Sequence, residues 1–241
     1  MKVPRVYLDT QALAAGAEVT LPKDAAKYLL RVLRRNSGDS VVLFNGDGHN
    51  YPATLAVNGK QATVNVSDKI VNAAESPLSI TLVQALAKGT KLDLIIQKAT
   101  ELGVQRIAPV IADRSVMQID QQRQQKKMDH WHAIAISACT QCGRSVLPVI
   151  DTPVELRQWL GSGVIDGLLL HPGGTQRLSD VSLPTDSCTL YIGPEGGFSD
   201  NEITMAADAG IQFVTCGPRV LRTETAGFTA IAVLQSKLGD L

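Results

Sequence analysis

The chain of 241 residues is poor in aromatic side chains and carries no net charge. Phe, Trp and Tyr together make up 4% of the residues, and 23 basic residues are balanced by 23 acidic ones. A protein that coats nucleic acid without selectivity needs an excess of positive charge, and a base-stacking surface needs aromatic rings. The composition therefore disfavours both kinds of nucleic-acid binder, although it allows recognition of a partner by shape at a local basic patch.

Long apolar runs are also missing. No run approaches the roughly 20 residues that a membrane-spanning helix needs, and the segment Met1–Arg5 lacks the features of a secretory signal. Hydrophobic residues make up 44% of the chain, which is enough for one large core or two modest ones. We therefore expect a cytoplasmic globular protein.

Cysteine is scarce, with four residues in the chain. Cys139 and Cys142 form a single C-x-x-C pair, and the other two cysteines stand far from it. A structural zinc site usually takes four ligands from paired motifs, and His130 and His132 are not spaced to share one helix face with both thiols. We interpret the cysteines as packed thiols and expect no metal.

Turn signals divide the first seventy or so residues into short strands. The expected strands are Val41–Phe44, Tyr51–Val57 and Gln61–Val66, and the last two are joined by Asn58-Gly59, a favoured hairpin dipeptide. One helix is expected from about Lys23 to Arg35. The small, polar, proline-ended segment Val71–Pro77 resembles a linker. We therefore expect two domains, residues 1–72 and 73–241.

Basic residues gather on the helix expected over residues 23–35. Lys27, Arg31 and Arg34 fall on one face at positions i, i+4 and i+7, and no acidic residue lies between residues 25 and 37. A solvated charged face is the usual explanation for such a pattern. Here, however, repulsion among the charges is uncompensated unless a polyanion neutralises it. The pattern favours contact with RNA.

Strands and helices alternate beyond the linker. Apolar residues repeat at helical spacing from Leu92 to Leu102, which predicts a helix. Thr90 and Asp93 predict a cap at its N-terminal end. The alternation predicts a mostly parallel α/β sheet, and ligands of such sheets bind beyond the carboxyl ends of the strands. The expected strands are Ser79–Leu86, Arg106–Ala112, Gly167–His171, Cys188–Ile192 and Ile211–Cys216.

Three of these strands end in unusual loops, at residues 170–174, 192–199 and 216–226. The second loop contains three glycines, which let the backbone approach a ligand closely, and Ser199 with Glu202 then predicts a capping box. No phosphate-binding signature is present, so a phosphate cradle is disfavoured. A plain tight turn is the other interpretation of one such loop, but three at successive strand ends favour a shared ligand.

The third loop brings together Arg219, Arg222 and Glu224 before an apolar helix at Thr225–Leu238. An Arg222–Glu224 ion pair that anchors the loop is one interpretation, although exposed pairs contribute only about 0–1 kcal/mol. Charges concentrated in a predicted cleft are more simply explained as groups that face a ligand.

Segments Gly193–Gly197 and Gly217–Ala226 closely resemble the family that methylates N3 of a uridine in small-subunit (16S) ribosomal RNA, within the trefoil-knotted SPOUT methyltransferases. The resemblance covers nearly the whole chain. It implies an N-terminal PUA-like β-barrel for RNA, an α/β knotted C-terminal domain, S-adenosyl-L-methionine as cofactor, and a homodimer. Further matching segments are Pro4–Tyr7, Val32–Arg34, Gln97–Val104 and Cys139–Arg144.

The resemblance also implies roles for individual residues. Arg222 is expected to stabilise the anion that develops on the uracil oxygens, and either Glu195 or Glu224 is expected to accept the N3 proton. The residues expected to contact the cofactor are His171, Ile192, Gly193, Gly197, Cys216, Pro218, Leu221 and Thr223. Of these, Ile192 and Leu221 are expected to form apolar walls. The residues expected to contact RNA are Arg5, Arg31, Arg34, Lys88, Lys98, Arg114 and Arg144.

Two other functions remain open: a methyltransferase of the same fold that acts on transfer RNA, and a ribosome-assembly factor that binds RNA without catalysis. Phosphate contacts position a substrate but do not specify a base. A chain without net charge is therefore expected to prefer folded ribosomal RNA, within a ribosomal particle, to bare RNA. Lys98 has a second interpretation, as a solvated residue on its helix.

Overall fold

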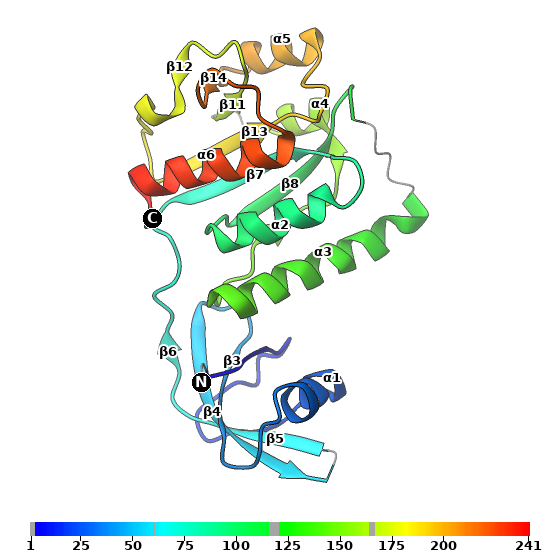
Figure 1. The fold of residues 1–241 in the computed structure, drawn as a ribbon, viewed down its shortest axis with the longest axis vertical. Helices are drawn as coiled ribbons and strands as arrows, with labels where there is room; N and C mark the ends of the chain where they lie inside the picture. Colours follow the sequence, from blue (N-terminus) through cyan, green and yellow to red (C-terminus); the bar gives the residue numbers. More distant parts are fainter. Residues whose placement is uncertain (1–2, 60, 116–120, 164–166) are drawn as a thin grey trace. The chain divides into compact units, whose positions relative to one another are not determined.

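The computed structural model describes residues 3–59, 61–115, 121–163 and 167–241. The chain forms two compact units, each with its own hydrophobic core (Figure 1). The first unit is Met1–Glu75 together with Cys139–Leu147, and the second is Ser76–Ala138 together with Pro148–Leu241. The division at residue 75 falls in the expected linker. Residues 139–147 lie within the expected second domain in the sequence but pack with the first unit.

A six-stranded mixed sheet forms the first unit. The strand order is β1-β3-β4-β5-β2, with β6 paired to β4; β1 runs parallel to β3, and the other pairs are antiparallel. The hairpin predicted at Asn58-Gly59 is confirmed, because Asn58 pairs with Gln61. The strands are β1 (Arg5–Tyr7), β2 (Glu18–Thr20), β3 (Ser40–Phe44), β4 (His49–Asn58), β5 (Gln61–Val66) and β6 (Ile70–Val71).

The helix of the first unit is shorter than expected. It consists of α1 (Lys23–Lys27) and a π-helical turn, η1 (Tyr28–Val32), and Arg34 lies beyond it in the left-handed region with φ 52°. A π turn bonds each residue to one five positions away, so the α-helical spacing that aligned three basic residues does not apply. The prediction of a single basic helix face is wrong, although Arg31 and Arg34 are both exposed.

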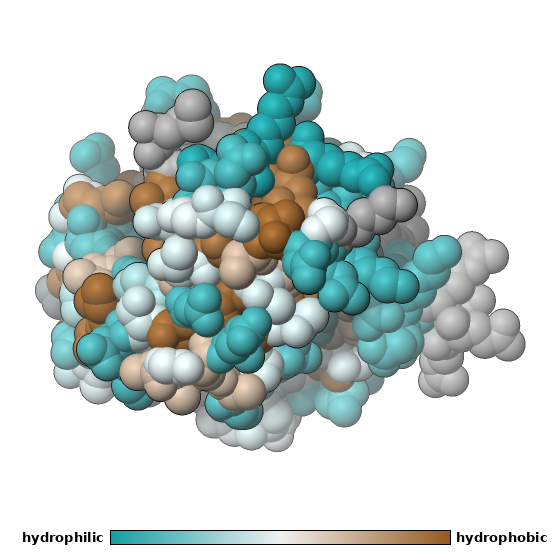
Figure 2. Space-filling view, turned by 90° about the horizontal axis from the view of Figure 1, so that it is seen from below, coloured by the Kyte–Doolittle hydropathy of each residue, from teal (hydrophilic) through white to brown (hydrophobic). Residues whose placement is uncertain are grey.

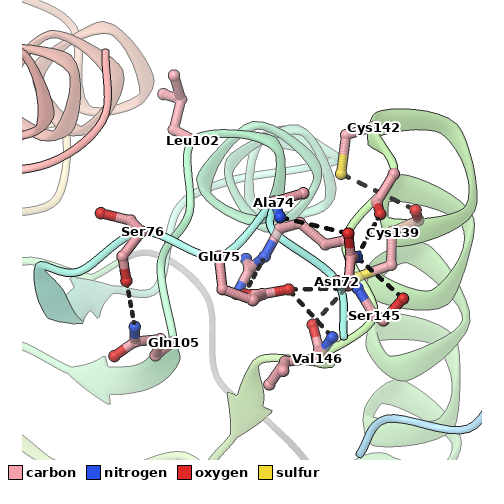
Figure 3. Close-up of polar contacts among 12 residues, drawn as sticks. Asn72, Ala74, Glu75, Ser76, Leu102, Gln105, Cys139, Cys142, Ser145 and Val146 are labelled. Atoms are coloured by element: carbon pink, nitrogen blue, oxygen red, sulfur yellow. Dashed lines mark hydrogen bonds and ion pairs between the residues drawn. The ribbon is translucent and has the colours of Figure 1, made fainter. Parts of the chain in front are cut away.

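Residues 139–147 are joined to the first unit by a buried polar network (Figure 3). The guanidinium of Arg144, which is 2% exposed, lies 2.9 Å from the carboxylate of Glu75. The same carboxylate accepts hydrogen bonds from the N–H groups of Ser145 and Val146, at 3.2 and 3.1 Å. Burial of a charge is costly unless it is paired and hydrogen-bonded. This network therefore stabilises the insertion of a distant segment into the first unit.

Arg5 belongs to the same network. Its guanidinium donates to Asn50 at 2.7 Å, and to Arg144 O and Ser145 Oγ at 2.9 Å. It also lies 4.8 Å from the centre of the Phe44 ring. Arg5 and Arg144, both expected to contact RNA, are thus engaged inside the first unit.

Cys139 and Cys142 are free thiols on the last turn of α3 (Gln121–Cys142). Cys139 is buried, and burial raises its pKa to about 12. The thiol is therefore protonated at neutral pH and behaves as a small packed group. Among the described residues, no three His, Cys, Asp or Glu side chains are grouped so that they could hold a metal ion.

An eight-stranded sheet forms the centre of the second unit. Its order is β10-β8-β7-β13-β11-β14-β12, with β9 paired to β8, and every described pair is parallel. The predicted mostly parallel α/β architecture is confirmed. The strands are β7 (Ser79–Ala85), β8 (Arg106–Ile111), β9 (Val149–Ile150), β10 (Val154–Glu155), β11 (Leu168–Leu170), β12 (Gln176–Arg177), β13 (Ser187–Ile192) and β14 (Gln212–Thr215).

Helices cover both faces of this sheet. Alternate residues of β7 point to opposite faces: Ile80 and Leu82 pack with α2 and α6, whereas Val83 and Ala85 pack in a second core with α4 and α5. None of the helices in the described part of the chain has the length and apolarity to cross a membrane. The helices not yet bounded are α2 (Lys91–Glu101), α4 (Leu156–Leu160), the 3-10 helix η2 (Leu178–Asp180), α5 (Asp200–Asp208) and α6 (Thr223–Leu238).

The two predicted helix caps have different outcomes. The capping box of Ser199 and Glu202 is confirmed, with both of its hydrogen bonds formed at the start of α5. Thr90 is the N-cap residue of α2, as predicted, but the predicted box with Asp93 is wrong, since the Thr90 side chain makes no cap bond. Asp93 instead lies 2.9 Å from the ring of His130 on α3.

The surface shown in Figure 2 is mixed, with brown apolar residues scattered among teal and white ones. Such a mixture is normal, because more than half of the accessible surface of a typical folded protein comes from apolar atoms.

We predict that Arg144→Met lowers the free energy of unfolding of the first unit by about 2–3 kcal/mol, because it leaves the Glu75 carboxylate without its charge partner. Denaturant unfolding of the full chain measures this change. Arg31→Met, which changes an exposed arginine of the same unit, is the control and should cost about 0.5 kcal/mol or less. Equal stability of the two variants would contradict a structural role for Arg144.

Candidate active site

The three glycine-containing loops of the second unit meet at one cavity of about 450 Å³. They follow β13, β11 and β14, which are neighbours in the sheet, and parallel strands present their carboxyl ends at the same edge. The convergence expected from the sequence is therefore observed. The lining residues are Lys91, Leu170, His171, Pro172, Ile192, Gly193, Pro194, Glu195, Gly197, Phe198, Thr215, Cys216, Arg219, Val220, Leu221, Arg222, Thr223 and Ala226.

Most residues that we expected to contact a cofactor line this cavity. Pro218 is the exception: it is an exposed residue of the third loop and does not line the wall. The residues that do line it are His171, Ile192, Gly193, Gly197, Cys216, Leu221 and Thr223. The structure thus brings together seven side chains or backbone segments drawn from three separate parts of the sequence.

Glycine is required at two positions for different reasons. Gly197 has φ +68°, a backbone conformation that other residues rarely adopt. At Gly174, a Cβ atom would lie 2.5 Å from the backbone carbon of Val214. The first loop therefore packs directly against the end of β14, with no space for a side chain between them.

A buried hydrogen-bond chain joins the second loop to α6. The fully buried Gln84, at the end of β7, donates from Nε2 to Thr223 Oγ1 at 3.0 Å. The Thr223 hydroxyl donates in turn to Gly193 O at 2.7 Å. Sequence reasoning missed Gln84, although an amide inside an apolar strand was a signal that could have identified it.

Opposite charges meet at Lys91. Lys91 and Glu195 line the cavity, whereas Glu224 is not among the lining residues. Lys91, the first residue of α2, donates from Nζ to Glu195 Oε1 at 2.7 Å. The same nitrogen lies 3.8 Å from Glu224 Oε2. In the described residues Glu224 forms its ion pair with Lys91 and none with Arg222, so the anchoring pair considered from the sequence is not formed. Lys91 was not predicted, because nothing in its local sequence indicates these long-range partners.

The ionisation of Glu195 reflects this environment. Partial burial raises its pKa, but the hydrogen bond from Lys91, backbone N–H groups and the positive charge of Lys91 together outweigh that effect. One of those backbone donors is the N–H of Lys88, at 3.2 Å from Oε1. The pKa of Glu195 therefore lies below its usual value, and the carboxylate is ionised at neutral pH.

Arg222 is the N-cap residue of α6 and lines the cavity with an exposed side chain. Its position at the point where the third loop enters the helix leaves the guanidinium available to a ligand. Both arginines of this loop that line the cavity, Arg219 and Arg222, are exposed.

The basic residues expected to contact RNA occupy different environments in the second unit. Arg114 donates to Gly196 O at 3.2 Å and to Phe198 O at 3.1 Å, so it supports the second loop. Lys98 pairs with Glu101 at 2.8 Å on the surface of α2. Lys88 is exposed beside the cavity wall that contains Glu195.

Two segments of the chain match known protein families. Residues 74–235 match an RNA methyltransferase domain, and residues 21–67 match an RNA methyltransferase PUA domain. Together they account for the core of the second unit and for much of the first.

Named relatives are similar over nearly the full length of the chain. The ribosomal RNA small subunit methyltransferase E of Buchnera aphidicola is 32% identical, across 99% of this chain and 95% of the relative. The protein of the same name from Neisseria gonorrhoeae, solved with S-adenosyl methionine, is 36% identical with a TM-score of 0.92. A Legionella pneumophila protein described as a methyltransferase, solved with the cofactor SAM, is 39% identical with a TM-score of 0.93. Both structures match over 100% of each chain.

We predict that Gly174→Ala lowers the free energy of unfolding by about 1–3 kcal/mol, because the new methyl group would overlap backbone atoms of β14. Its neighbour Gly173 supplies a matched control. A Cβ atom there would meet only the His171 ring, at 3.2 Å, so Gly173→Ala should cost about 1 kcal/mol or less. Denaturant unfolding compares them, and a larger loss in Gly173→Ala would disprove the close packing.

Proposed function

Because this chain belongs to the RNA methyltransferase family whose domain spans residues 74–235, we propose that it transfers a methyl group from S-adenosyl-L-methionine to N3 of a uridine in small-subunit ribosomal RNA. One observation carries the proposal: three backbone-rich loops form a single cavity in the part of the chain that matches this family. Full-length similarity to two proteins solved with this cofactor supports the choice of ligand.

The cavity suits a sulfonium nucleoside. Its volume of about 450 Å³ is typical of small-molecule sites, and Ile192 and Leu221 supply apolar walls. Within the described residues, the N–H groups of Val220 and Leu221 form no hydrogen bond and are free to bind a nucleobase edge. When bound, the cofactor supplies an electrophilic methyl group. We assign its contacts to the predicted residues that line the cavity: His171, Ile192, Gly193, Gly197, Cys216, Leu221 and Thr223.

The residues around the cavity suit deprotonation of a base. Uridine N3 carries a proton that must leave before or during attack on the methyl carbon. We assign to Arg222 the stabilisation of negative charge on the uracil oxygens. Glu195 and Glu224 are the two candidates for the proton acceptor. Both carboxylates form an ion pair with Lys91, so this contact does not favour one of them as the proton acceptor.

For RNA binding we propose the exposed cations Arg31 and Arg34 in the first unit and Lys88 in the second. Arg5, Arg144 and Arg114 have protein partners that account for them. We further propose that the protein is a cytoplasmic homodimer with the trefoil knot of its family, and that it acts on folded RNA in a ribosomal particle. The lack of net charge supports selective over general RNA binding.

The decisive experiment is mass spectrometry of nucleosides from ribosomal RNA of a strain that lacks this protein. We expect N3-methyluridine to be missing from small-subunit RNA and restored by the parent gene. Loss from transfer RNA alone would overturn the substrate assignment. Calorimetry with S-adenosyl-L-methionine tests the other alternative, because a non-catalytic assembly factor has no need to bind it.

We predict that Arg222→Ala slows methyl transfer roughly 100-fold, as loss of one stabilising donor does elsewhere, while the Kd for S-adenosyl-L-methionine stays within about twofold. Single-turnover assays and calorimetry measure the two quantities. Arg157→Ala, at an exposed arginine of α4 outside the cavity, is the control and should retain the parent rate. Equal rates for Arg222→Ala and the parent would remove the assigned role.

A further inference from the structure

We propose that Lys91 is a positioning residue for the methyl transfer, whose ammonium group holds Glu195 and Glu224 around one positive charge. The inference rests on the proposed function and deepens it. It concerns how the two candidate proton acceptors are held in place, whichever of them receives the proton.

Lys91 joins three segments that are far apart in the sequence. It begins α2, Glu195 lies in the second loop, and Glu224 lies in the first turn of α6. Its Nζ atom is 2.7 Å from Glu195 Oε1 and 3.8 Å from Glu224 Oε2. The side chain of Lys91 is only about one-third exposed. These contacts make Lys91 the cross-link between a helix and two elements of the cavity.

Glu224 is partly buried, so its carboxylate needs a compensating positive charge. Its Oε2 atom is buried and, within the described residues, has no hydrogen-bond partner. A buried carboxylate without compensation is costly, and Lys91 lies within ion-pair distance of this one. The positive charge of Lys91 therefore offsets the burial of Glu224, while a direct hydrogen bond fixes Glu195.

Removal of this charge would leave the carboxylates of Glu195 and Glu224 without the cation that both of them contact. Like charges at short range favour protonation of one member of the pair. The other titratable or charged groups that line the cavity are His171 from the first loop and Cys216, Arg219 and Arg222 from the third. None of these forms an ion pair with Glu195 or Glu224 in the described residues, so they do not replace Lys91.

The test compares Lys91→Met, Lys91→Arg and the parent chain, assayed on small ribosomal subunits. For Lys91→Met we expect kcat to fall roughly tenfold or more, with the acid limb of the pH–rate profile moved upward by about one pH unit. The sign follows from the lost cation, which raises the pKa of Glu195 so that a higher pH is needed to ionise it. The Kd for S-adenosyl-L-methionine should change less than about twofold. Lys91→Arg should restore most of the rate.

Lys237→Met is the matched control. Lys237 is a hydrogen-bonded lysine in the last turn of α6, where Nζ donates to Ser179 O at 2.8 Å, and it lies outside the cavity. It should keep the parent's kcat and pH profile. A variant that merely loosens the fold would lower stability without moving the acid limb.

Each outcome separates the inference from the proposed function. An unchanged kcat and acid limb in Lys91→Met would overturn the positioning role. Loss of cofactor affinity with an unchanged limb would also overturn it, because Lys91 would then hold the cofactor. If the parent chain itself methylates no ribosomal RNA, the proposed function fails. Carboxyl NMR of Glu195 still tests the ion pair in that case: a higher pKa in Lys91→Met supports it, and an equal pKa refutes it.

Discussion

The candidate site depends on the parallel alignment of three neighbouring strands, β13, β11 and β14. Because they run in the same direction, their carboxyl ends reach the same edge of the sheet. The loops at residues 170–174, 192–199 and 216–226, which are separated in the sequence by other segments, therefore form one cavity. Strand pairing brings the loops to the same edge of the sheet. Glycines such as Gly174 allow the backbone of a loop to pack closely against a neighbouring strand.

Side chains outside the loops hold this arrangement in place. Gln84 and Thr223 connect the end of β7 to the second loop through buried hydrogen bonds. Arg114 supports the same loop from its other side, through the carbonyls of Gly196 and Phe198. The loops are thus preorganised by the sheet and its helices, which limits the ordering that a ligand must impose.

The first unit illustrates a different constraint. Segment 139–147 begins in the last turn of α3, in the second half of the chain, yet its polar groups form hydrogen bonds with Glu75 and Arg5. A charge such as Arg144 can be buried only where a partner is available. The unit is therefore completed by residues that any division of the sequence into consecutive domains assigns elsewhere.

Local sequence determined much of this protein: the hairpin at Asn58-Gly59, the capping box of Ser199, the alternation of strands and helices, and the three loops after the strands. These features depend on backbone preferences and on residues close in sequence. Only the tertiary structure decided the partners of Lys91, the burial of Arg144 and the early end of the basic helix at Val32. Each of these depends on groups brought together by folding, and sequence spacing carries no record of such distances.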